Sequence, residues 1–163
     1  MSRHAFSFLK PLVSALLISS CATAAQAGDG ETIFLNNCAA CHGMDAEGIP
    51  GVAPMLQNEM LWKTLDERAI DYIAGVVTSG LSGKIQVNGK SFNGVMPPQT
   101  HLSSKELAAV TNYVLQKVNR SSVTVDIAHI ERARQTPLTY ARLYALRTGE
   151  ITLAQAGKAA AQD

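Results

Sequence analysis

The sequence of 163 residues predicts a small all-α domain in which short helices are joined by long loops. Apolar residues recur at three- and four-residue spacings in three segments, which is the pattern of helices that bury one face. The segments between them are rich in Gly and Pro, and only residues 85–87 show a short piece of strand-like sequence. With 47% hydrophobic and 17% charged residues, the composition is typical of a soluble protein with one core.

The three helices are predicted over Glu31–Cys41, Asp66–Ser79 and Ser104–Asn119. In the first, acidic residues stand near the N-terminus, where they complement the positive end of the helix dipole. The second ends before a glycine, a residue that readily takes the left-handed conformation found at helix ends. The third begins with a capping box, in which Ser103 is followed three residues later by Glu106.

Residues 1–27 have the features of a secretory signal peptide that is removed from the mature chain. Basic residues precede an apolar run over 11–20, and the small-x-small triplet that ends at Ala27 is a cleavage signal. The run is well short of the roughly 20 residues that a helix needs to cross a bilayer, so we expect no membrane span. A second interpretation remains open, because the segment that ends at Cys21 resembles a lipobox and would place a lipid anchor on that cysteine. Both interpretations imply an exported, periplasmic protein, and an uncleaved segment is the third alternative.

The rest of the chain divides into a main segment, residues 28–119, and a helical C-terminal extension, residues 120–163. The main segment carries six basic and nine acidic side chains, whereas the extension carries six basic and four acidic ones. The net charge of the whole sequence is only +1, which gives no electrostatic basis for binding nucleic acid.

Helices are expected in the extension over Val123–Arg134 and Thr139–Arg147, with a third from Thr152 to Ala161. Their apolar residues have to be buried either on the main segment or on a partner protein, and the sequence leaves both alternatives open. Because the extension is basic, we expect it to select partners rather than to shape the functional site.

The residues that carry chemistry are Cys38, Cys41 and His42, which form a Cys-x-x-Cys-His motif. This is the attachment sequence of c-type haem. Residues three and four apart share one helix face, so two thiols can meet the vinyl groups of one porphyrin while the histidine reaches the iron. The alternatives are a redox-active dithiol and half of a zinc site. Zinc would need two more ligands, and after the motif the sequence offers His101 and His129 but no further cysteine.

A large apolar ligand would explain two other features of the sequence. The Gly- and Pro-rich loops over 43–54 and 80–100 are long for a compact domain. Aromatic residues for a core are few, with 4 Phe, 4 Tyr and 1 Trp in the whole sequence. A porphyrin that the loops surround would supply the missing buried surface.

The sequence resembles the class I cytochromes c over residues 30–119. The likeness lies in the helix before the motif, the Cys-x-x-Cys-His-Gly sequence itself, Gly51 and Pro54 in the next loop, residues 89–97 with the sequence Gly-Lys-Ser-Phe-Asn-Gly-Val-Met-Pro, and the last helix with Asn112-Tyr113-Val114. The resemblance implies the class I cytochrome c fold around one covalently bound haem c. It also implies that the first and last helices cross near the haem, where Gly30, Phe34 and Tyr113 would meet.

The same resemblance implies that His42 binds the iron and that a second ligand comes from the other face of the porphyrin. Met96 is the preferred residue, because a flexible Asn-Gly turn precedes it and two prolines that stiffen an extended loop follow it. His101 and an open iron position are the alternatives. The backbone carbonyl of Pro54 is implied to accept a hydrogen bond from Nδ1 of His42, which would fix the imidazole.

These residues imply a carrier of single electrons between a redox donor and an acceptor oxidoreductase, not an enzyme. Two other classes remain: a subunit bound permanently to a larger periplasmic oxidoreductase, and a haem enzyme or gas sensor with an open iron. Trp62 and Tyr72 could donate hydrogen bonds to the haem propionates, and ordinary packing is an equal alternative for both.

Overall fold

The computed structural model describes residues 26–151. The signal-peptide segment up to residue 25, Cys21 included, and the helix expected from Thr152 to Ala161 lie outside the described residues. No helix within 26–151 is long and apolar enough to cross a membrane.

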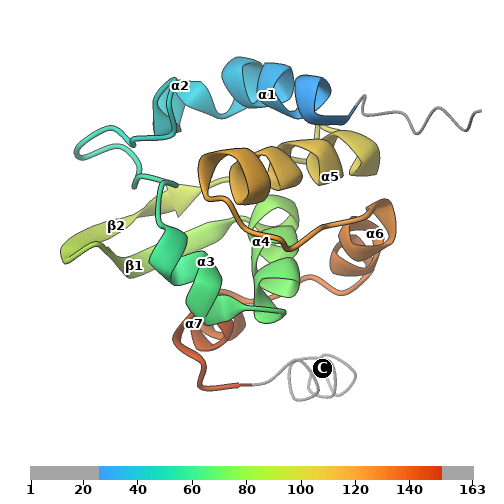
Figure 1. Ribbon diagram of the computed structural model, residues 1–163. Coiled ribbons are helices and arrows are strands. Elements are labelled where there is room, and N and C mark those ends of the chain that lie inside the picture. The colour runs from blue at the N-terminus through green and yellow to red at the C-terminus, as the bar shows by residue number, and fades with distance from the viewer. Residues whose placement is uncertain (1–25, 152–163) are drawn as a thin grey trace, which may run out of the picture.

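Helices dominate the described chain, and one β-hairpin projects from them (Figure 1). Helices α1 and α5 lie side by side, α4 packs behind α5, and α6 and α7 cover α4 from the side away from α1. The elements in chain order are α1 (Gln26–Asn37), α2 (Ala39–His42), α3 (Glu59–Leu65), α4 (Arg68–Ser79), β1 (Leu81–Val87), β2 (Lys90–Met96), α5 (Ser104–Asn112), the π-helix η1 (Tyr113–Val118), α6 (Ile127–Gln135) and α7 (Tyr140–Thr148).

Two of the three helices predicted in the main segment are confirmed with shifts of one or two residues at most. Helix α4 occupies the second prediction, and α5 with η1 fills the third, including the capping box of Ser103 and Glu106. The first is divided, because the backbone leaves α1 after Asn37 and begins the separate turn α2 beyond Cys38. Helix α3 was not predicted from the sequence; the side chain of Asn58 caps it by accepting from the backbone N–H of Leu61.

The helical fold is confirmed, but it contains a hairpin where the sequence indicated no strand beyond a short piece at residues 85–87. Strands β1 and β2 pair antiparallel over seven residues each, from Leu81 opposite Met96 to Val87 opposite Lys90. The turn residues Asn88 and Gly89 both have positive φ, which an Asn-Gly pair tolerates in a two-residue hairpin. Exposure alternates along the whole of β1, but only Ile85 and Val87 are buried and Gly83 lies on their face, so the sequence pattern was weak. The fold is therefore mostly helical with one small hairpin.

The first and last helices of the main segment cross as expected. The rings of Phe34 on α1 and Tyr113 on η1 lie 5.4 Å apart, and Phe34 is fully buried. Gly30 permits the close approach, because a Cβ there would come within 2.4 Å of the backbone oxygen of Ala109.

The extension packs on the main segment, which answers the question that the sequence left open. Its residues Val125, Ile130, Leu143 and Leu146 are buried in the same hydrophobic cluster as the helices of the main segment. Helix α6 packs on α4 and α5, and α7 packs on α4 and β1. The apolar side chains of the extension therefore complete the core, while the expectation that the extension selects partners stays a prediction.

Candidate functional site

The Cys-x-x-Cys-His motif forms one tight turn directly after α1. Cys38 donates its backbone N–H to the carbonyl of Phe34 at 2.8 Å, and the backbone N–H of His42 reaches the carbonyl of Cys38 at 2.9 Å. Cys38 is half-buried and Cys41 is exposed, and the two do not form a disulfide. The turn therefore presents both cysteines and the histidine in the compact arrangement that attachment of one porphyrin requires.

His42 is buried and held by one hydrogen bond. Its Nδ1 atom lies 2.9 Å from the carbonyl oxygen of Pro54, twelve residues further along the chain. Because Nδ1 is engaged as a donor, Nε2 is the atom left to bind a metal. Burial lowers the pKa of His42 below its usual value, although the bond to Pro54 acts in the opposite direction. A low pKa favours the neutral imidazole, which is the form that binds iron.

The loop from Gly43 to Pro54 is closed on itself so that Pro54 returns to the histidine. Gly48 donates its backbone N–H to the carbonyl of His42, and Ile49 pairs with Ala53 in an isolated antiparallel bridge. Gly48 has a φ of +78°, and a Cβ there would lie 2.4 Å from the backbone nitrogen of Met55. Only glycine fits this left-handed, crowded position without strain.

Asn119 fixes the chain just beyond this loop, and sequence reasoning missed it. Its side chain is buried and donates through Nδ2 to the carbonyls of Leu56 and Val114, at 2.9 and 2.8 Å. Its Oδ1 accepts from the backbone N–H of Asn58 at 2.6 Å. A buried amide with three bonds links the segment after Pro54 to the last helix of the main segment, over more than sixty residues of sequence.

The two alternatives to haem attachment are not supported by the chemistry of these side chains. Burial, with a further contribution from Cys41, raises the pKa of the Cys38 thiol to about 11. A redox-active dithiol normally depends on a cysteine of lowered pKa. Within residues 26–151 no three His, Cys, Asp or Glu side chains come close enough to hold a metal ion.

Met96 ends strand β2, and the chain on either side of it contacts the segments that flank the haem motif. Before it, the Asn88 side chain donates to the sulfur of Met55 at 2.9 Å. After it, Nε2 of His101 lies 3.1 Å from Oδ1 of Asn37. Met96 lies between these two contacts in the sequence. The Met96 side chain is partly buried against the core.

Two other methionines and two histidines of the described chain differ from Met96 in exposure or in hydrogen bonding. Met44 and Met60 are 63% and 74% exposed, so neither is held against the core. The ring nitrogen Nε2 of His101 already contacts Asn37, and His129 takes part in the N-terminal cap of α6 with Asp126.

Trp62 and Tyr72, considered above for the propionates, both have partners within the protein. The indole N–H of Trp62 points to the carbonyl of Leu56 at 3.4 Å, which is a long bond. The hydroxyl of Tyr72 accepts from Nη1 of Arg147 at 2.9 Å. The two rings lie 6.2 Å apart, as in an ordinary aromatic pair of a core.

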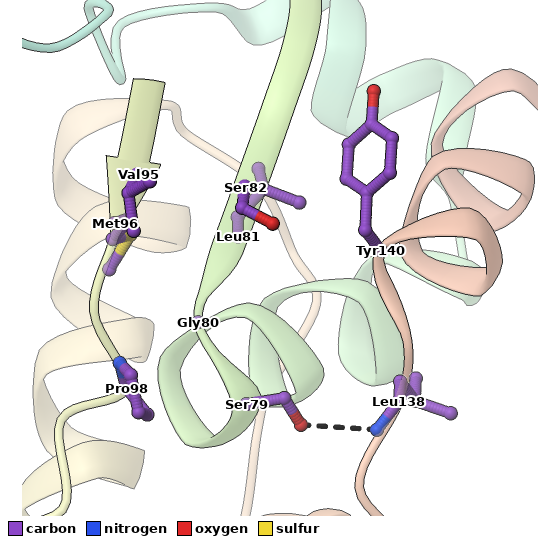
Figure 2. A pocket seen from close by; sticks show the side chains of 9 residues that line it. All are labelled: Ser79, Gly80, Leu81, Ser82, Val95, Met96, Pro98, Leu138 and Tyr140. Atoms are coloured by element: carbon purple, nitrogen blue, oxygen red, sulfur yellow. Dashed lines mark hydrogen bonds between the residues drawn. The ribbon is translucent and has the colours of Figure 1, made fainter. Parts of the chain in front are cut away.

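A small cavity of about 180 Å³ lies between the start of the hairpin, the end of α4 and residues 138–140, as Figure 2 shows. On one side of it, Ser79 accepts a hydrogen bond from the backbone of Leu138 at 3.1 Å. The cavity is smaller than the roughly 300 Å³ at which pockets for drug-sized ligands begin. Met96 is among the residues that line it, but none of them belongs to the Cys38–His42 turn.

The fold and this donor set define a haem protein of the c type. The residues of the turn fit the group: two thiols stand on one turn, and an imidazole keeps its Nε2 free.

A family model described as Cytochrome c matches residues 27–117, which is more than half of the chain. The chain belongs to the cytochrome c family. The cofactor of this family is covalently bound haem c, and the chain has the Cys38 and Cys41 pair that binds it. The related cytochromes c-552 and c6 are electron carriers rather than enzymes.

Three relatives illustrate the range of the family. Cytochrome c-552 of Thermus thermophilus is 36% identical over 106 residues, which cover 65% of this chain and 70% of the relative. Cytochrome c6 of Microcystis aeruginosa is 30% identical over 92 residues, or 56% of this chain and 98% of the relative. The cytochrome c subunit of the quinone alcohol dehydrogenase of Gluconobacter oxydans is 30% identical over 114 residues, or 68% of this chain but only 23% of that protein.

Proposed function

We propose that this cytochrome c transfers single electrons in the periplasm between a donor and an acceptor redox protein, with His42 and Met96 as the axial ligands of its haem. The observation that carries the proposal is the bond of 2.9 Å between Nδ1 of His42 and the carbonyl of Pro54. It fixes the tautomer and direction of an imidazole that is anchored next to an attached cysteine. Removal of residues 1–27 as a signal peptide fits this location, because thioether attachment of haem takes place outside the bacterial cytoplasm.

The residues of the chain hold the redox site constant while its charge changes. Bound haem supplies the one-electron couple of its iron. His42 is buried and anchored through Pro54, so it keeps its position in both oxidation states. Met96 ends a paired strand, and from there its sulfur would bind the iron on the side opposite His42. With both of these ligands supplied by the protein, no site would be open to a substrate, and little would have to reorganise when an electron moves.

Partner docking is supported by apolar side chains that flank the site on the surface. Met44 and Val52 lie in the loop that follows His42, and Val95 precedes Met96 on β2. These side chains are 63%, 60% and 78% exposed. Apolar residues at the centre of a small contact, with charged residues around it, suit brief encounters between redox proteins.

A second candidate is a cytochrome subunit held permanently in a larger periplasmic oxidoreductase, with or without a lipid anchor at Cys21. One observation favours it: a relative of 30% identity is itself a cytochrome c subunit of a quinone alcohol dehydrogenase. In that case the same apolar side chains would be covered by the other subunits.

Purification of the mature protein from its native envelope at low and high salt separates the two candidates. A carrier is expected to elute alone with one haem, to titrate as a single one-electron couple, and to bind no carbon monoxide when reduced. Constant co-elution with an oxidoreductase at high salt would favour the subunit. Rapid carbon monoxide binding by the reduced protein would contradict both. The intact mass of the product shows whether the chain begins at Gly28 or at an acylated Cys21.

A further inference from the structure

Strand β1 has an outer edge that no other strand covers within the described part of the chain, where the sheet consists of β1 and β2 alone. In an antiparallel pair, every second residue directs its N–H and C=O away from the partner strand. Lys84 and Gln86 are two such residues on β1. An uncovered edge is free to move or to pair wrongly, so proteins usually protect it.

Helix α7 of the extension covers this edge with two side chains. The hydroxyl of Tyr140 donates to the carbonyl oxygen of Lys84 at 2.6 Å, and Nη2 of Arg147 donates to the carbonyl oxygen of Gln86 at 3.0 Å. Tyr140 and Arg147 are seven residues apart, which is two helical turns, so both lie on the side of α7 that faces β1. The helix thus supplies donors to the strand as a neighbouring strand would.

The contact between Tyr140 and the hairpin is close. A Cβ at Gly83 would come within 3.0 Å of the ring of Tyr140, and Gly83 has a φ of +101°. A side chain at this position would push the helix away from the strand.

Arg147 also ties the strand to the core of the molecule. Its Nη1 donates to the hydroxyl of Tyr72 on α4 at 2.9 Å, and its guanidinium carbon lies 5.6 Å from the centre of the Tyr72 ring. Tyr72 is buried, so it is a fixed point. One guanidinium therefore joins α4, α7 and β1. It can do so because its planar group carries several N–H donors that bond different acceptors at the same time.

The position of β1 determines that of Met96. The two strands are paired along their full length, and Met96 lies opposite Leu81 at the end of the ladder. Holding β1 at Lys84 and Gln86 therefore also holds β2, and with it the sulfur of Met96.

We propose that Tyr140 and Arg147 are positioning residues for the axial sulfur: by holding the outer edge of β1, helix α7 keeps Met96 on the iron. The inference rests on the proposed ligand role of Met96. It gives the extension a function in the redox site, although the extension supplies no ligand itself.

Two mild variants of the haem-loaded full-length protein test the proposal. Tyr140→Phe removes one hydroxyl and no charge. Arg147→Lys keeps the charge but cannot bond Gln86 and Tyr72 with the same fork. The matched control is Arg134→Lys, because Arg134 on α6 likewise bonds two groups of the main segment, the carbonyl of Leu102 and the hydroxyl of Ser104.

The readouts are the near-infrared band of methionine sulfur on ferric haem, the midpoint potential and the rate of carbon monoxide binding to the reduced protein. Carbon monoxide can bind only where the sulfur has left the iron, so its rate follows the sulfur-free population. We expect Tyr140→Phe and Arg147→Lys each to raise that rate about fivefold, the factor that corresponds to one net hydrogen bond of roughly 1 kcal/mol. The near-infrared band should weaken and the potential should shift in both, while Arg134→Lys keeps the wild-type values.

The outcomes distinguish this inference from the proposed function. If the wild type shows the band and both variants keep its intensity, potential and carbon monoxide rate, α7 merely stabilises the fold and the inference is wrong. Equal changes in Arg134→Lys would also overturn it, because they would reflect general loosening of the extension. Absence of the band in the wild type would refute the ligand role of Met96 instead, and the inference would fall with it.

Discussion

Gly30 on α1 lies directly against the backbone of Ala109 on α5, because a Cβ at residue 30 would come within 2.4 Å of the carbonyl oxygen of Ala109. The neighbouring backbone cannot yield as a flexible side chain would. Gly30→Ala should therefore separate the two helices and lower the free energy of unfolding by about 1–3 kcal/mol. Urea denaturation measures the loss, with Asn36→Ala on the exposed side of α1 as the control. Equal stability of Gly30→Ala and the wild type would show that the helices do not cross this closely.

We expect Asn119 to contribute more to the free energy of unfolding than an average polar residue does. Asn119→Ala leaves the carbonyls of Leu56 and Val114 and the N–H of Asn58 without their partner, in a part-buried to buried region. We expect a loss of about 2–4 kcal/mol in the free energy of unfolding, since each buried group left unpaired costs about 1–3 kcal/mol. Gln116→Ala, which removes bonds at a half-exposed site, should cost under about 1 kcal/mol. Similar losses in both variants would contradict the role given to Asn119.

What the sequence predicted depends on how local each feature is. The Cys38–His42 motif and the capping box at Ser103 are signalled by neighbouring residues, and the helices follow from periodicity. The Gly30 contact was expected only because the family resemblance implied that the first and last helices cross. The hairpin escaped because glycines stand at Gly83 and Gly94 on its inward face, which leaves Ile85 and Val87 as the clear apolar alternation. The Asn-Gly pair at its turn was the available signal.

Long-range side-chain contacts could not be predicted in this way. Asn119 meets Leu56 across 63 residues, and Arg147 meets Tyr72 across 75. Neither residue type nor spacing indicates such partners, because any buried amide or guanidinium needs a partner from somewhere in the fold. The same reason left the packing of the extension open until the structure placed Ile130 and Leu146 in the core.

The extension should be indispensable for stability. Ile130 is fully buried on α6, whereas Ile127 on the same helix is 43% exposed. Ile130→Ala is expected to cost about 2–5 kcal/mol in the free energy of unfolding, and Ile127→Ala well under half of that. Thermal and urea unfolding of the haem-loaded variants check this, together with truncation after Asn119, which should fail to give a stable fold. A truncated protein as stable as the full chain would show that the extension packs only loosely.

Acid should weaken the cap of α6. The backbone N–H of His129, bonded to the Asp126 carboxylate, holds the pKa of Asp126 below its usual value. A carboxyl whose pKa is lowered on folding adds stability above its unfolded pKa, and the contribution disappears as the pH falls through the folded pKa. Asn caps helices about as well as Asp but does not titrate there. The thermal midpoint of the wild type should therefore fall more steeply than that of Asp126→Asn below about pH 4. Parallel curves for the two proteins over pH 2–5 would show that the cap does not contribute.

The central claim is that the sulfur of Met96 and Nε2 of His42 together hold the haem iron of an electron carrier. The most direct measurement is the near-infrared absorption of the ferric protein, compared between wild type, Met96→Ala and His101→Ala. We expect the methionine band in the wild type and in His101→Ala, and its loss in Met96→Ala, which should keep its haem attached but bind carbon monoxide when reduced. If only His101→Ala opened the iron to carbon monoxide, His101 would be the second ligand instead of Met96, and the electron-carrier function would still stand. A wild type that lacks the band and readily binds carbon monoxide would contradict the account.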